Sequence, residues 1–320
     1  MKTPTRISFG ETISELGGED SAIVVFDADL AKSTQSIRFG KRFPDRFFEM
    51  GIQEQNMIGT AAGMALSGKK PFICSFATFV VGRFETIRMS IAYSNAPVVI
   101  VGTHCGIGVG EDGYSQMALE DIALMRSLPG MHVIHPADDV ETRQVVRYLV
   151  EHPHPAYLRL TRQAVPDVHG EDYVFRFGKA DPLRPGRDAV VFCCGPVVSH
   201  ALDSAETLAL EGYDVRVVNI HTIKPLDIDT VVAAARETGR VVTVEDHSII
   251  GGLGSAIAET LGEILPTPIL RIGIRDVFGE SGSSEALYEK HGLDAKGITL
   301  QIRAFLEGTP AFHRANSSAG

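Results

Sequence analysis

One carboxylate stands where a strand is expected to turn into a helix. The segment FFEMGIQEQNMIGTAAGMALSG, residues 47–68, has a short apolar run, a glycine and then a helical pattern. Glu54 lies at the turn, between two glutamines. The backbone would fix its position, which suits a group that shares or transfers a proton, but a first-turn glutamate can also interact with the helix dipole. The predicted buried face of the helix comprises Ile58, Ala61, Ala62, Ala65 and Leu66.

Other polar and aromatic side chains follow further expected strands of the N-terminal part. In open α/β sheets, ligands bind beyond the carboxyl ends of the strands, so residues in these places are candidates for a site. They are Asp27, Asp29, Ser33, Phe76, Phe79, His104, Asp112, Gln116 and Arg162. Helix capping could account for Asp29 and Ser33, core packing for the two phenylalanines, and a surface ion pair for Arg162.

The elements that must position these residues alternate along most of the chain. Continuous apolar strands such as SAIVVFDAD, KPFICSFATF and NAPVVIVGTH are separated by amphipathic helices, and the pattern resumes with AVVFCCG. It predicts an α/β fold of two doubly wound domains with mostly parallel sheets. The expected division is residues 1–170 for the first domain, 171–188 for a linker, 189–313 for the second domain and 314–320 for a disordered tail.

The composition limits the classes of function. A formal net charge of −10 argues against nucleic acid as a partner, because a phosphate backbone requires a basic face. The sequence shows neither an apolar run of 18 or more residues nor a signal peptide, so we expect a cytoplasmic protein without a membrane span. The four cysteines are expected as buried free thiols, and no metal site is predicted. An anionic substrate is still compatible where Arg and His converge.

Two glycine-rich stretches superficially suggest a dinucleotide site. GVGEDG matches G-x-G-x-x-G at Gly108, Gly110 and Gly113. Glu111 and Asp112 would repel a pyrophosphate placed there, so we do not predict a nicotinamide cofactor. GGLGSAI lacks the last glycine of the fingerprint and is interpreted as a closely packed helix N-terminus.

Several segments together resemble the transketolase family. They are DADLAKST, GIQEQNMIGTAAGMA, CSFATF, GTHCGIGVGEDGYSQMALEDIALMRSLPGMHVIHPAD, LTRQ and VEDHSIIGGLGSA, in the family's order. The likeness covers nearly the whole chain but corresponds to the C-terminal half of a full-length transketolase. The G-D-G motif of the diphosphate- and Mg²⁺-binding domain does not occur in the sequence. The resemblance therefore implies the second subunit of a split transketolase, with a pyrimidine-binding domain and a transketolase C-terminal domain.

The resemblance implies thiamine diphosphate as the cofactor, with Mg²⁺ bound mainly by the partner subunit. In this family the glutamate of EQNM, here Glu54, bonds N1′ of the aminopyrimidine and thereby promotes loss of the C2 proton of the cofactor. Phe76 and Phe79 would line the aminopyrimidine pocket and stack on the ring. Asp29 resembles an aspartate near the linker of the cofactor.

The resemblance also assigns substrate contacts. Asp112 is similar to the aspartate that bonds a hydroxyl of the donor sugar. Residues that would reach substrate phosphate are Arg6, Ser33, His104 and Arg162. Gln116 stands where many transketolases carry His, and it can hydrogen-bond the sugar but cannot shuttle a proton. Arg83 receives no role, because Gly82 occupies the place where some relatives carry Tyr or Arg.

The implied reaction is transfer of a two-carbon ketol unit from a ketose phosphate to an aldose phosphate. The expected assembly contains two copies of this chain and two of an N-terminal subunit that carries the diphosphate and Mg²⁺ site. One alternative is a subunit of an enzyme like 1-deoxyxylulose-5-phosphate synthase or a 2-oxo acid dehydrogenase, which releases CO₂ with the same cofactor. The other is a non-catalytic α/β binding subunit.

Overall fold

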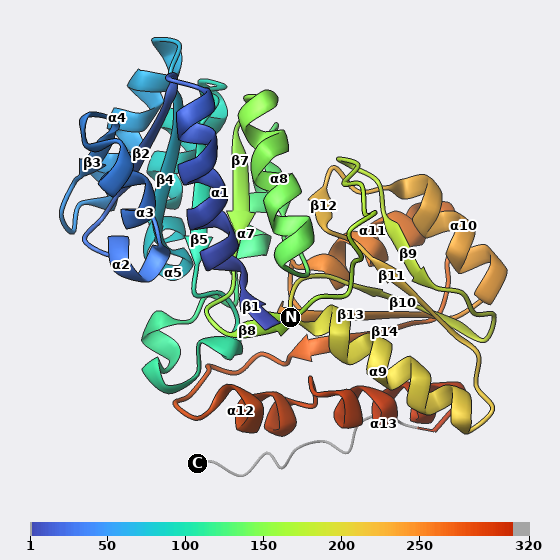
Figure 1. Cartoon of the computed structure of the whole chain (residues 1–320). Helices are drawn as coiled ribbons and strands as arrows, with labels where there is room; N and C mark the ends of the chain where they lie inside the picture. Colours follow the sequence, from blue (N-terminus) through green and yellow to red (C-terminus); the bar gives the residue numbers. More distant parts are fainter. Residues whose placement is uncertain (1, 310–320) are drawn as a thin grey trace.

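The computed structural model describes residues 2–309, which contain two large sheets covered by helices and a separate two-stranded sheet (Figure 1). The predicted α/β class with mostly parallel sheets is confirmed. The expected tail, residues 314–320, lies outside the described residues. Within residues 2–309, no helix combines the length and the apolar character needed to cross a bilayer.

The N-terminal part is built on a seven-stranded sheet in the order β12-β6-β7-β5-β4-β2-β3. Its strands are β2 (Ile23–Asp27), β3 (Phe47–Glu49), β4 (Lys70–Phe76), β5 (Val99–Thr103), β6 (His132–Ile134), β7 (Ala156–Arg159) and β12 (Thr222–Lys224). All neighbours pair in parallel except β12, which is antiparallel to β6. Every residue of β2 and β5 is buried, as expected for parallel strands covered on both faces.

Alternate residues of these strands face two different layers of helices. Ile23 and Val25 of β2 join a core with α1 (Thr5–Glu19), α3 (Ile37–Arg42) and α8 (Asp139–Glu151). Val24 and Phe26 point the other way, toward the remaining layer. That layer comprises α4 (Glu54–Leu66), α5 (Ala77–Val81), the π-helix η2 (Ile87–Tyr93) and α7 (Asp121–Ser127). The short helices of this part are α2 (Ala31–Thr34), α6 (Phe84–Thr86), η1 (Pro44–Arg46), η3 (Ile107–Asp112) and η4 (Tyr114–Gln116).

Helix α4 follows its predicted pattern over most of its length. Ile58, Ala61, Ala62 and Ala65 are buried, but Leu66 is 65% exposed. Leu66 lies in the last turn, which ends at Ser67, so the buried face stops one position earlier than the sequence pattern predicts.

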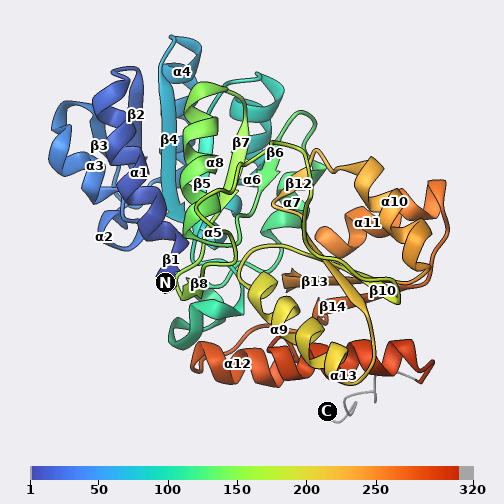
Figure 2. The same cartoon turned by 45° about the vertical axis from the view of Figure 1, so that its right-hand side comes forward.

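The C-terminal part is built on a five-stranded sheet in the order β14-β13-β10-β11-β9. Its strands are β9 (Asp181–Arg184), β10 (Ala189–Cys193), β11 (Val215–Asn219), β13 (Val241–Ser248) and β14 (Ile269–Ile274). The helices of this part are α9 (Val197–Leu210), α10 (Ile228–Thr238), α11 (Leu253–Ile264), α12 (Ser284–His291) and α13 (Ala295–Leu306). Helices α9 and α13 pack side by side along one face, as both views show (Figure 2). All four cysteines are buried and free, as the sequence predicts.

The structure contains short antiparallel strands that the alternating pattern does not predict, and one of them links the two parts. Strand β12 comes from the C-terminal part of the sequence but extends the N-terminal sheet at β6. Residues 171–188, expected as a linker, contain β9, which pairs with β11. Near the N-terminus, β1 (Lys2–Pro4) pairs with β8 (Ala164–Pro166), which begins two residues after Arg162 in the chain.

Candidate active site

Three rings line up where strands β4 and β5 end. Phe76, the last residue of β4, stacks on His104 with ring centroids 3.7 Å apart and on Phe79 with centroids 5.6 Å apart. The register pairs Phe76 with Thr103, so the residue after Thr103 lies beside the phenylalanine. The structure therefore brings together two predicted cofactor residues and one predicted substrate residue.

His104 is buried and held in an unusual backbone conformation. Its φ angle is +58°, and its Nδ1 lies 2.9 Å from the Thr103 hydroxyl. Burial and the nearby positive charges of Arg6 and Arg162 lower the pKa of His104 to about 3. The imidazole is thus neutral at physiological pH and can exchange hydrogen bonds with a ligand, but it does not contribute a positive charge.

Arg6 and Arg162 face a common pocket beside His104. The Arg6 guanidinium donates to the Ser33 carbonyl, and the Arg162 guanidinium donates to the Val109 carbonyl. The Arg6 Nε is buried without a partner among the described residues. Burial and the charge of Arg162 both lower the pKa of Arg6, which shows that the two cations lie close together.

We call the cavity between these arginines the arginine pocket; its volume is about 280 Å³. Its lining residues are Arg6, Gly108, Val109, Gly110, Glu111, Arg162, Gln163, Ser283, Ser284 and Glu285. The pocket thus brings two arginines together in a chain with net charge −10, with the carboxylates of Glu111 and Glu285 also in its lining.

Of the remaining polar candidates, one contacts an arginine of the pocket and two bond other residues. Asp112 is exposed, and its Oδ1 lies 4.0 Å from the Arg162 Nη1. Gln116 is half-buried and donates to the Ser115 hydroxyl at 3.2 Å. Asp29 is exposed with φ +65°, and its backbone N–H donates to the Glu49 carboxylate at 2.7 Å.

Helix capping does not explain Asp29 and Ser33. Helix α2 begins after Leu30, whose side chain makes no capping bond, and Ser33 lies within the helix. Ser33 contributes its carbonyl to Arg6, as described above. The sequence left open either helix capping or a role in the site for these two residues, and the structure excludes helix capping for both.

Glu54 is the first residue of α4 and is only 5% exposed. Within residues 2–309, no group donates a hydrogen bond to its carboxylate or forms an ion pair with it. Such a buried carboxylate is costly unless something completes its bonding. Helix α4 packs against α5, which carries Phe79, so Glu54 belongs to the same layer as part of the ring stack.

Asp27 supports the site in a way that the sequence did not indicate. Its carboxylate accepts from the Leu30 N–H and from the hydroxyls of Thr34 and Ser36. Burial raises its pKa to about 6, although these three hydrogen bonds oppose the shift. Asp27 therefore shapes the turn that carries Asp29 and Ser33.

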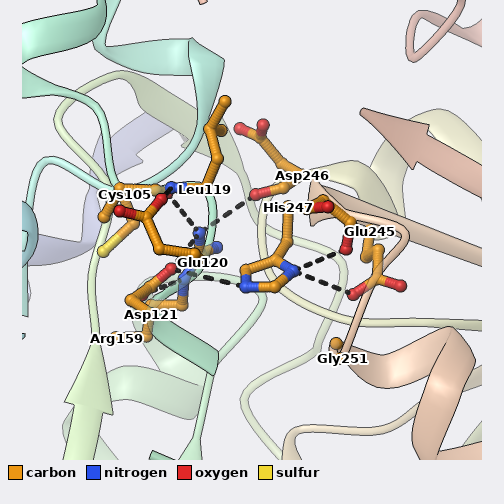
Figure 3. Close-up of polar contacts among 12 residues, drawn as sticks. Cys105, Leu119, Glu120, Asp121, Arg159, Glu245, Asp246, His247 and Gly251 are labelled. Carbon is orange, nitrogen blue, oxygen red and sulfur yellow. Dashed lines mark hydrogen bonds and ion pairs between the residues drawn. The ribbon is translucent and has the colours of Figure 1, made fainter. Parts of the chain in front are cut away.

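A network of buried ionisable side chains lies between the two parts of the chain. Arg159 donates to both carboxylate oxygens of Asp121, at 2.7 and 3.1 Å, and both residues are fully buried or nearly so. His247 lies between Asp121 and Glu245 (Figure 3). Charged letters inside the apolar runs AYLRL and RVVTVEDHS were the only sequence signal for this network.

The GGLG stretch is not a ligand site in the structure. Glu245 accepts hydrogen bonds from the N–H groups of Leu253 and Gly254, at 2.7 and 2.9 Å. The N-terminus of α11 is therefore occupied by a carboxylate of the chain itself, in agreement with the predicted close packing.

Comparisons with known proteins agree with this architecture. Residues 1–168 match the family described as the transketolase pyrimidine-binding domain, and residues 178–298 match the transketolase C-terminal domain. The two matching domains imply a protein of the thiamine-diphosphate-dependent class. The chain belongs to the transketolase family.

Two relatives and one solved structure are similar over almost their full lengths. The 6-deoxy-6-sulfo-D-fructose transketolase subunit SqwH of Clostridium sp. is 42% identical, over 95% of this chain and 94% of that protein. An apulose-4-phosphate transketolase subunit of Phocaeicola vulgatus is 41% identical, over 94% of this chain and 97% of that protein. A split gene transketolase solved as an inactive β4 tetramer aligns with a TM-score of 0.88 and 46% identity, over 95% of this chain and 98% of that one.

Proposed function

We propose that this chain is the C-terminal subunit of a transketolase that transfers a two-carbon ketol unit from a ketose phosphate to an aldose phosphate. The observation that carries this proposal is the arginine pocket beside the ring stack of Phe79, Phe76 and His104. Two arginines near an aromatic surface at the carboxyl ends of parallel strands support the proposal of an anion site there. A phosphorylated sugar next to a flat heterocyclic cofactor needs both features.

The residues present fit the pyrimidine end of thiamine diphosphate. The carboxylate of Glu54 is only 5% exposed and would share a proton with N1′ of the aminopyrimidine. Phe76 and Phe79 would pack against the ring, and Asp29 would lie near the linker of the cofactor. When bound, the cofactor supplies the nucleophilic carbon and the electron sink for cleavage of a carbon–carbon bond beside a carbonyl.

The substrate would be held by the other side chains of the site. Arg6 and Arg162 would bind the phosphate, since their planar guanidinium groups match phosphate oxygens. His104 and the Ser33 hydroxyl would add neutral hydrogen bonds to it. Asp112 would accept a bond from a sugar hydroxyl, and Gln116 would bind a hydroxyl or carbonyl oxygen without proton transfer.

We further propose that a second subunit completes the site. The two relatives above are each named as one subunit of a transketolase, and the similar split gene structure is an inactive β4 tetramer. In this proposal, the N-terminal subunit supplies Mg²⁺ and the diphosphate contacts. The assembly then contains two copies of each chain in the cytoplasm.

The test is to mix this chain with a G-D-G-bearing N-terminal subunit, thiamine diphosphate and Mg²⁺, and to follow products by mass spectrometry. We expect a ketose phosphate donor to be shortened and an aldose phosphate acceptor to be lengthened by two carbons. Release of CO₂ from pyruvate, with no exchange between sugars, would replace the proposal by the decarboxylating alternative. Binding without any turnover would favour the non-catalytic alternative.

A further inference from the structure

The loop of residues 106–113, which we call the glycine loop, links the arginine pocket to the C-terminal part. It contains the 3₁₀ helix η3 and carries Asp112. Its Val109 carbonyl accepts the hydrogen bond from Arg162. Any shift of this loop would therefore move a partner of Arg162 and a neighbouring carboxylate together.

A single carboxylate of the C-terminal part holds the start of the glycine loop. Asp246, on β13, accepts from the Ile107 N–H at 2.8 Å and from the Gly108 N–H at 3.4 Å. It also accepts from the Tyr288 hydroxyl at 2.8 Å, and that hydroxyl accepts from the Gln163 side chain at 2.6 Å. The chain of bonds ends next to Arg162, because Gln163 is the following residue.

The loop's glycines are explained by this close approach. A Cβ atom at Gly106 would overlap the Asp246 carboxylate, and one at Gly108 would overlap the side chains of Gln163 and Tyr288. Farther along, the Ser284 hydroxyl of α12 donates to the Gly108 carbonyl at 2.8 Å. Figures 1 and 2 both show this segment lying against α12. The pattern that resembles a dinucleotide motif thus reflects packing between the two parts.

Asp246 is itself anchored in the buried network of Figure 3. The Arg159 Nη2 donates to its backbone carbonyl at 3.0 Å and also to Asp121 at 3.1 Å. Asp246 is only 1% exposed. Its carboxylate therefore offers the glycine loop a fixed acceptor rather than a mobile surface group.

We propose that Asp246, together with Tyr288, is a positioning residue that holds the glycine loop and thereby sets the geometry of the arginine pocket. The expected effect of Asp246 on turnover rests on the proposed function. The expected effect of Asp246 on the glycine loop does not, because these hydrogen bonds lie within this chain. Asp246 then contributes to sugar phosphate recognition without itself lining the arginine pocket.

The structural test is amide hydrogen exchange, measured on the isolated chain. Asp246→Asn keeps the shape but removes charge and one acceptor, so exchange at Ile107 and Gly108 should rise about tenfold. Tyr288→Phe should raise it in the same direction by a smaller factor, about threefold. Tyr213→Phe is the matched control: its hydroxyl donates to the exposed Glu307, and exchange in the glycine loop should not change.

An unchanged exchange rate in the loop of both variants would overturn the proposal. If Asp246→Asn raises exchange throughout the chain by loss of folding, the Tyr288→Phe result decides: a rise confined to the loop supports the proposal, and no rise overturns it.

A kinetic readout in the assembled enzyme separates positioning from a general structural role. Tyr288→Phe should raise KM for a phosphorylated acceptor about tenfold, with a smaller change in kcat and with the KM for a non-phosphorylated acceptor little changed. Equal losses for both acceptors would contradict positioning of the arginine pocket. If the wild-type assembly shows no ketol transfer at all, the proposed function fails, whereas the exchange result still decides the role of Asp246.

Discussion

The arginine pocket and the network around Arg159 use the same kinds of residues in opposite ways. In the network, Arg159 bonds both oxygens of Asp121 as well as the carbonyls of Ala118 and Asp246. At the site, the carboxylate of Glu54 and the Nε of Arg6 find no partner within residues 2–309. The difference indicates that burial of charge alone does not mark a site, since the Arg159–Asp121 pair is fully buried and bonded within the chain.

The same contrast appears in protonation. Burial would raise the pKa of Asp121, but Arg159 more than offsets this effect and holds it below its usual value. At the site, burial and then the positive charges of Arg6 and Arg162 lower the pKa of His104 to about 3, so the imidazole is neutral. The network therefore holds a buried carboxylate in its charged form, whereas the site holds a buried imidazole in its neutral form.

The comparison predicts the largest effect on activity at Glu54. Glu54→Gln should slow loss of the cofactor's C2 proton by ~10²–10⁴-fold, because the amide cannot share a proton as the carboxylate does. The free energy of unfolding should change little, since the side chain has no internal partner to lose. Deuterium exchange at C2 in the assembled enzyme measures the first effect and urea unfolding the second. A wild-type exchange rate would remove Glu54 from the mechanism.

The next largest effect is expected on stability, in the network. Asp121→Ala leaves the Arg159 guanidinium buried without its counter-charge and should lower the free energy of unfolding by about 3–5 kcal/mol. The control is Glu19→Gln, because Glu19 forms an exposed ion pair with Arg147 at 3.2 Å. That change should cost less than about 1 kcal/mol. Similar losses for both variants in urea unfolding would contradict the distinction drawn between buried and exposed pairs.

The sequence predicts most of the fold because buried parallel strands carry a continuous local signal. The strands β2, β4 and β5 and the face of α4 follow directly from apolar runs and helical spacing. Strands β9 and β12 are only four and three residues long and pair with distant segments, so no local pattern indicates them. The exposure of Leu66 likewise depends on tertiary packing, because neighbouring elements cover α4 only up to the residue before it.

The candidate site was less accessible to sequence reasoning. Motifs pointed to Phe76 and His104 separately, but their stacking depends on the register between β4 and β5. The role of Asp246 could not be predicted, because it joins residues 139 positions apart. The catalytic and binding roles of the site residues stay predictions until the variants are measured.

A smaller effect on activity is expected in the arginine pocket. Arg162→Ala removes a charge-assisted contact worth roughly 1.5–3 kcal/mol and should lower kcat/KM for a phosphorylated sugar about 10- to 100-fold. A non-phosphorylated acceptor should be affected much less. Arg147→Ala, which removes an exposed arginine outside the pocket, provides the control. An equal loss for both acceptors would mean that Arg162 does not bind phosphate.

The smallest predicted effect is the pH dependence of stability at His169, a buried histidine that is paired with carboxylates. Burial would lower the pKa of His169, but hydrogen bonds to Asp138 and Asp181, at 2.8 and 3.1 Å, raise it to about 10. Because the folded-state pKa is raised, its stabilisation is complete below about pH 6.5 and is lost as the pH rises toward 10.

Replacement of this histidine should therefore matter less at high pH. His169→Gln should cost more unfolding free energy at pH 6 than at pH 9, by about 1 kcal/mol or more. Urea unfolding of both proteins at the two pH values gives the comparison. A cost that does not depend on pH would show that His169 does not act through its charge.

The most direct test of the central claim is calorimetric titration of thiamine diphosphate with Mg²⁺. The claim is that this chain provides only the pyrimidine and substrate side of the site, with its unused bonding groups completed by a second subunit. The account predicts weak or no binding to the isolated chain and tight, Mg²⁺-dependent binding once a G-D-G-bearing subunit is added. Tight, Mg²⁺-dependent binding together with ketol transfer by the isolated chain would contradict it.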